Sequence, residues 1–161
     1  MDVLEVHLQN HWAAAAGGLD LATRVARTHA DSDVGADLAS VARDIAEDRE
    51  TLRELMVVLD LDPGTVGPVV ARVAERIGRL KPNGRALRRS PVSDVLELEA
   101  LRAAIGAKRA GWDTLLVLSQ GVDLLPRDGL RRLRDRADAQ LERLAEVQAT
   151  VVRHRRSPAI A

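Results

Sequence analysis

Hydrophobic residues recur along this chain at alternating spacings of three and four, the pattern that keeps side chains on one face of a packed α-helix. Four long segments carry this pattern: Met1–Ala30, Val34–Leu61, Val92–Gly121 and Gly129–Arg156. In the second segment the apolar positions are Val34, Leu38, Val41, Ile45, Leu52, Leu55 and Leu59. The pattern predicts four helices that each turn one face toward a common core.

The connections between these segments predict the directions of the helices. Asp31-Ser32-Asp33 supplies a tight turn and an N-cap for the second helix, and residues 121–128 join the third helix to the fourth, so each pair is antiparallel. About thirty residues, 62–91, separate the second helix from the third. Since a 28-residue helix is about 42 Å long, only this crossover can return along the bundle.

We therefore predict one all-α domain over residues 1–161, an up-down-down-up four-helix bundle with a frayed tail at 157–161. The crossover has its own amphipathic pattern and predicts an extra helix, on the residues Val69, Val70, Val73, Ile77 and Leu80.

Each of the four apolar faces is interrupted once by a polar residue near its centre: His11, Asp48, Lys108 and Gln140. With the predicted helix directions, Asp48 lies beside Lys108, Gln140 lies opposite residue 109, and His11 lies about one turn away. The chain has 22 arginines but only two lysines, so Lys108 on an apolar face indicates a need for a compact ammonium group, or one that can lose its proton when buried.

Several stretches resemble a group of uncharacterised bacterial proteins of the ferritin-like superfamily: Gly78-Arg79-Leu80-Lys81-Pro82-Asn83-Gly84-Arg85, Ser90-Pro91-Val92-Ser93 and Glu97-Leu98-Glu99. The resemblance implies a ferritin-like bundle, and such bundles hold di-iron or di-manganese centres near the middle of the helices. That pattern uses Glu-x-x-His on two helices, and this chain contains no such motif.

Two interpretations of the polar layer remain. One is a buried network in which Asp48 pairs with Lys108 while His11 and Gln140 complete the hydrogen bonds, which sets the helix register. The other is an altered metal or small-molecule site. His7 and His11 are one turn apart and, with Asp44 or Asp48, form a candidate site for iron, manganese or zinc. Asp44 has an alternative position, turned outward toward Arg43 or across to Arg109.

Charge is segregated along the chain, although the net charge is zero. Residues 31–62 carry a net −7, and residues 72–89 carry a net +6. The basic residues of the crossover are Arg72, Arg76, Arg79, Lys81, Arg85, Arg88 and Arg89. This basic patch either packs on the acidic second helix or binds phosphate or nucleic acid. Arg131 to Arg136, on the fourth helix, are expected on a solvated face.

The composition narrows the classes of function. The absence of Cys excludes disulfides and thiolate chemistry, and two aromatic residues, Trp12 and Trp112, are too few for a base-stacking platform. With no signal segment and no long apolar run, we expect a cytoplasmic protein that does not enter the membrane.

We expect a non-enzymatic interaction or structural protein that needs no cofactor and that forms a homodimer or binds a helical partner. The alternatives are a ferritin-like metal-binding or redox protein and a protein that binds phosphate or nucleic acid through the basic crossover.

Overall fold

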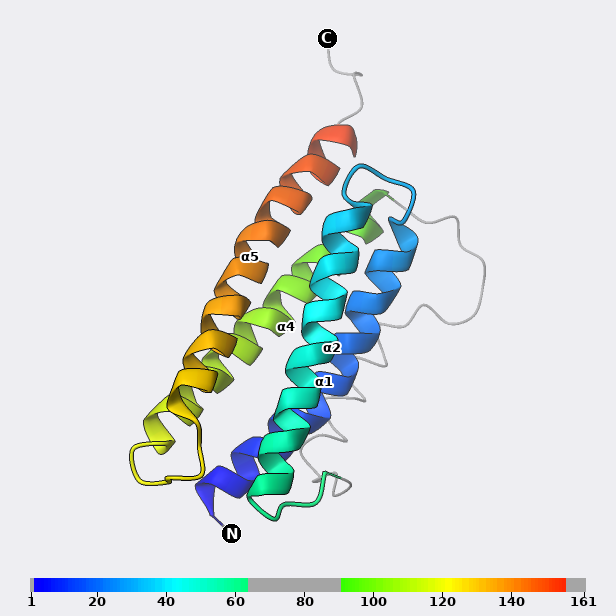
Figure 1. Ribbon diagram of the computed structural model, residues 1–161. Coiled ribbons are helices and arrows are strands. Elements are labelled where there is room, and N and C mark those ends of the chain that lie inside the picture. The colour runs from blue at the N-terminus through cyan, green and yellow to red at the C-terminus, as the bar shows by residue number, and fades with distance from the viewer. Residues whose placement is uncertain (1, 64–90, 156–161) are drawn as a thin grey trace.

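The computed structural model describes residues 2–63 and 91–155, which form a bundle of long helices (Figure 1). These are α1 (Val3–Thr28), α2 (Gly35–Val58), α4 (Pro91–Leu118) and α5 (Arg127–Arg155). The predicted all-α four-helix bundle is confirmed. The predicted crossover helix, the basic patch within it and the tail lie outside the described residues.

The directions of the helices follow from the contacts between them. Gly111 of α4 contacts His7 near the start of α1, whereas Glu97 pairs with Arg24 near its end, so α1 and α4 are antiparallel. In Figure 1, α1 and α5 run upward, and α2 and α4 run downward. Neighbouring helices pack in the cyclic order α1, α2, α5, α4, so α2 and α4 lie parallel to each other across the diagonal of the bundle.

The core is built from the predicted apolar faces. On α2, all the predicted positions from Val34 to Leu55 are buried, and Leu59 packs partly buried against them. Met56, outside the predicted face, is fully buried as well. Burial of each such side chain contributes roughly 1.5–3 kcal/mol, so this continuous face stabilises the packing of α2 in the bundle.

The turn between α1 and α2 differs from the prediction. Val34 occupies the N-cap of α2 and makes no side-chain cap hydrogen bond, so Asp33 is not the cap. Ser32 instead donates its Oγ–H back to the carbonyl oxygen of His29, at 2.7 Å. A Cβ on Gly35 would lie 2.6 Å from that same oxygen, so the chain re-enters the helix here at a glycine because a side chain would not fit.

The end of α2 comes earlier than Leu61, the last residue of the predicted helix. Asp60 has a φ of 56°, in the left-handed region, and Leu61 N–H donates to the carbonyl oxygen of Met56 at 2.9 Å. This hydrogen-bond pattern is that of a Schellman motif, which ends the helix before Asp62-Pro63.

None of the described helices has a stretch both long and apolar enough to span a bilayer.

Candidate functional site

Asp48 lies at the centre of the bundle, where its side chain is 1% exposed. Lys108 reaches it from the diagonally opposite helix α4 and pairs with its Oδ2. The same ammonium group donates to Gln140 Oε1 on α5, at 2.7 Å. The structure therefore brings together three of the four polar residues that interrupt the apolar faces, and these three come from three different helices.

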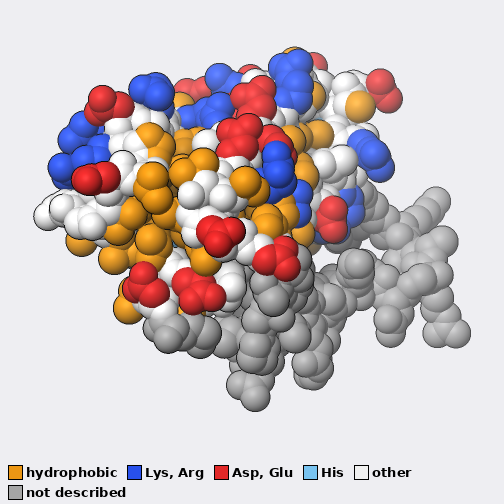
Figure 2. Space-filling view, turned by 60° about the horizontal axis from the view of Figure 1, so that its bottom comes forward, with side chains coloured by type: hydrophobic (Ala, Val, Ile, Leu, Met, Phe, Trp, Pro, Cys, Tyr) orange, Lys and Arg blue, Asp and Glu red, His pale blue; other side chains and the backbone are white. Residues whose placement is uncertain are grey.

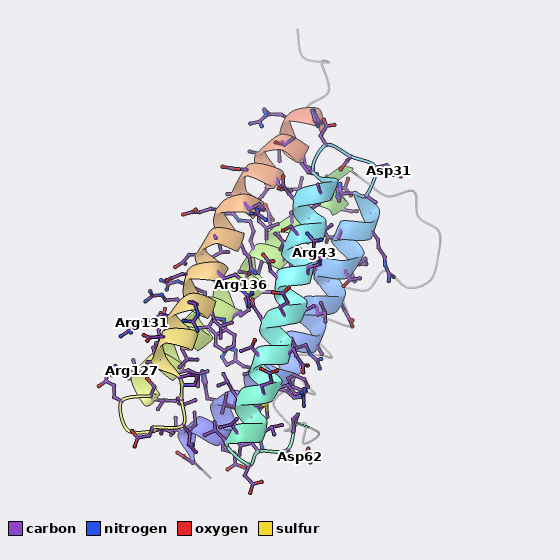
Figure 3. The ribbon with its side chains drawn as sticks, in the orientation of Figure 1. Asp31, Arg43, Asp62, Arg127, Arg131 and Arg136 are labelled. Carbon is purple, nitrogen blue, oxygen red and sulfur yellow. The ribbon has the colours of Figure 1, made fainter. Side chains whose placement is uncertain are left out.

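Arg136 completes the surroundings of the Asp48 carboxylate. Its Nη2 pairs with Asp48 Oδ1, and its Nη1 donates to Glu47 Oε2 at 3.0 Å. Figure 3 labels Arg136 on α5, on the side that faces α2. Both oxygens of the buried carboxylate thus face a cation, Lys108 on one side and Arg136 on the other.

The prediction that Arg136 lies on a solvated face is wrong, although the same prediction holds for Arg131, which pairs with Asp128 at 2.7 Å. Arg136 precedes Gln140 by four residues, so the two lie on the same side of α5. The spacing of four residues therefore predicts that Arg136 faces Asp48, but only if Gln140 is already known to face Asp48.

Burial lowers the pKa of Lys108, and the nearby Asp48 carboxylate opposes that shift. The positive charge of Arg136 acts in the same direction as burial. Lys108 therefore gives up its proton more readily than a surface lysine, while Asp48 keeps it positioned through the ion pair.

His11 lies in a different environment, between α1 and α4. A Cβ on Gly111 would lie 2.7 Å from His11 Nε2 and 2.8 Å from Nδ1, so the His11 ring occupies the space that this glycine leaves open. The His7 ring lies beside it at a tilt of 53°, with ring centroids 4.4 Å apart, and His7 Nε2–H donates to the carbonyl oxygen of Gly111 at 3.2 Å. The polar layer predicted as one network thus has two parts, an ionic cluster around Asp48 and a histidine pair on Gly111.

Burial, with a smaller contribution from His7, lowers the pKa of His11 to about 4. His11 is therefore a neutral imidazole at pH 7.

The candidate metal ligands His7, His11, Asp44 and Asp48 are only partly brought together. The two histidines are adjacent, but His7 Nε2 is hydrogen-bonded to Gly111, and Asp48 is paired with Lys108 and Arg136. Across residues 2–63 and 91–155, no group of three or more His, Asp or Glu side chains could hold a metal ion. The charge of Asp44 acts on Lys108 and opposes the lowering of its pKa by burial, while Arg109 pairs with Asp113 and Asp138.

A second buried polar pair, His29 and Asp94, was not singled out from the sequence. His29 Nε2 lies 3.9 Å from Asp94 Oδ1, and the two side chains are 8% and 2% exposed. His29 also lines a cavity of about 160 Å³ beside the α1–α2 turn, with Ser32, Asp33, Val34, Val151 and His154. The pair joins the end of α1 to the start of α4.

The outer face of α4 is an uncharged surface that the periodicity of the sequence does not reveal. Between Val92 and Leu118, eight residues are exposed, and the only charged one is Glu99. The other seven form what we call the α4 stripe: Val92, Leu96, Ala100, Ala103, Ala107, Ala110 and Val117. They follow one another mostly at spacings of three and four, so they share one side of the helix.

The exposed face of α5 provides a contrast within the same molecule. Thirteen residues are exposed between Arg127 and His154, and nine of them are Asp, Glu or Arg. Other exposed hydrophobic residues, Val3, Val57 and Val58, lie at the end where α1 begins and α2 ends. Figure 2, in which this end is turned forward, shows hydrophobic side chains with acidic and basic groups around them.

Comparisons of the chain with protein-family models, with curated proteins and with solved structures found no match.

Proposed function

We propose that this chain is a helical interaction protein that binds a polypeptide helix on the α4 stripe. The observation that carries the proposal is the exposure of large apolar side chains along a helix face with almost no charge. Val92, Leu96 and Val117 are 61%, 57% and 66% exposed. A helix that is apolar on both its inner and outer faces is typical of one buried within a larger assembly.

The small residues at the centre of the stripe favour a helix as the partner. Ala100, Ala103, Ala107 and Ala110 would let a second helix approach to about 8 Å between axes, near the lower limit for packed helices. An extended or irregular segment would leave its backbone hydrogen-bonding groups unsatisfied on such a surface.

We further infer that the ionic cluster around Asp48 is structural and stands in place of the di-metal centre of a ferritin-like bundle. The Asp48 carboxylate is neutralised on both sides, and Lys108 and Arg136 bring positive charge to the place where a metal would bind. A buried cluster of this kind specifies one register between α2, α4 and α5, because any slip would leave charges unpaired. It would hold the α4 stripe in a fixed orientation toward its partner.

Site-specific photo-cross-linking tests the proposal. A photoreactive side chain replaces Ala103 in the full chain, and a matched variant carries it at Ala139, an exposed alanine on α5. We expect an adduct of defined mass from position 103, none from position 139, and loss of the adduct when Leu96→Glu is added. Equal cross-linking from both positions, or none from either, would overturn the proposal.

A further inference from the structure

We infer that the helix bound on the α4 stripe is α4 of a second copy of this chain, in an antiparallel pair around a two-fold axis between Ala103 and Ala107. This inference rests on the proposed function and names the partner.

The stripe is complementary to itself in this arrangement. A two-fold axis at the level of residue 105 places Ala103 opposite the second copy's residue 107, and Ala100 opposite its residue 110. Leu96 then faces residue 114, and Val117 faces residue 93. Alanines meet alanines at the centre, where the helix axes are closest, and the larger side chains lie toward both ends, where the axes diverge.

The charged side chains beside the stripe are engaged elsewhere. Glu99 accepts a hydrogen bond from Gln148 of α5, at 3.4 Å. Arg109 pairs with Asp113 on its own helix and with Asp138 on α5. The seven residues of the stripe carry no charge, so an uncharged copy of the same surface can cover them without leaving a charge of the stripe unpaired.

The exposed area agrees with a dimer of moderate affinity. Covering the stripe and its flanks on both copies would bury roughly 1,000–1,200 Å² in total. This area lies at the lower limit for specific interfaces, so we expect a dissociation constant in the micromolar range.

Sedimentation and light scattering of the full chain test the inference. A monomer has a mass of 17.5 kDa. We expect the mass to approach twice this value as the concentration rises to about 200 μM, and Ala103→Glu to weaken dimerisation at least about 100-fold. Ala139→Glu, the matched control on α5, should dimerise like the wild type, and circular dichroism checks that both variants are helical.

A wild-type chain that stays monomeric throughout this range overturns the inference, and so does a dimer that responds equally to both variants. The photo-cross-linking experiment separates this outcome from failure of the proposed function. An adduct at position 103 with a mass other than twice that of the chain overturns the homodimer while the interaction surface stands. The absence of any adduct removes both.

Engineered cysteines test the antiparallel direction, because the chain has no cysteine of its own. An Ala103→Cys chain mixed with an Ala107→Cys chain should give a mixed disulfide under mild oxidation. Val92→Cys should not link to itself, because its two copies would lie about 39 Å apart, far beyond disulfide reach. Efficient self-linking of Val92→Cys would indicate a parallel pair and overturn the proposed arrangement.

Discussion

At the scale of single residues, Asp48 is the centre of the buried ionic cluster. Its carboxylate is 1% exposed and lies between two cations, Lys108 and Arg136, which come from different helices. Two cations around one buried carboxylate make each of them partly replaceable by the other.

Removal of these cations should show that redundancy. We expect Lys108→Met or Arg136→Met alone to cost about 1–3 kcal/mol of unfolding free energy, because the remaining cation still neutralises Asp48. The double variant should cost about 1–3 kcal/mol more than the sum of the two, since it leaves the buried charge bare. Urea denaturation of the four proteins measures this coupling.

Asp48→Leu provides the control for the coupling. Added to the double variant, it should restore much of the lost stability, because the cluster then becomes apolar. If the losses of unfolding free energy caused by the two single changes simply add in the double variant, Lys108 and Arg136 do not neutralise Asp48 jointly.

His11 predicts a separate dependence of stability on pH. Its pKa falls from an ordinary value of 6.5 to about 4 in the folded chain. Between these values the unfolded state binds more protons than the folded state, so the unfolding free energy decreases as the pH is lowered from 6.5 to 4. Above pH 6.5 both states are neutral at this residue and the effect is absent.

Urea denaturation at pH 7 and pH 4.5 measures this contribution. We expect the wild type to lose about 2 kcal/mol more than His11→Asn on acidification, allowing for the partial exposure of the ring. Equal losses in the two proteins would show that His11 does not carry the pH dependence.

At the scale of helices, the close approach of α1 and α4 depends on Gly111. The sequence places His11 on the inner face of its helix but does not identify the glycine across from it, because that contact joins residues a hundred positions apart. The space for the His11 ring therefore depends on how α1 and α4 pack together, and the sequence of either helix alone does not predict it.

Replacement of Gly111 should reveal this contact. Although alanine favours a helix by about 1 kcal/mol, we expect Gly111→Ala to destabilise the protein by about 1–3 kcal/mol, because its Cβ would overlap the His11 ring. Gly18→Ala on α1 is the matched control, since a Cβ there meets nothing within 4 Å and should be neutral or stabilising. Thermal unfolding of both variants measures the difference, and similar shifts in Tm would rule out a tight contact at Gly111.

At the scale of the whole molecule, the directions of the helices require the chain between α2 and α4 to return along the bundle. The 24 residues of α2 span about 36 Å. A connection long enough to span this distance is therefore needed for α2 and α4 to run parallel.

Linkers of different length test this requirement. A six-residue Gly/Ser linker in place of residues 64–90 reaches about 20 Å from Pro63 and cannot return along the bundle to Pro91, whereas a 24-residue linker can. We expect the long linker to preserve the near-UV circular dichroism of Trp12 and Trp112 and a cooperative unfolding transition, and the short linker to lose both. Retention of both signals with the short linker would contradict the parallel placement of α2 and α4.

The amino-acid sequence alone determined the number of helices, their approximate bounds, their directions and most of the buried faces. These properties follow from periodicity and connection length, which are local features of a chain. The meeting of Asp48, Lys108 and Gln140 could also be anticipated, because each interrupts an apolar face at a level that helix length and direction predict.

Only the tertiary structure decided which polar groups pair and which faces remain uncovered. Arg136 turns inward to Asp48, and His11 packs on Gly111, because side-chain reach and helix separation depend on three-dimensional distances. The α4 stripe became recognisable only when the helices were assembled, since an alanine-rich face has the same sequence pattern whether it is buried or exposed.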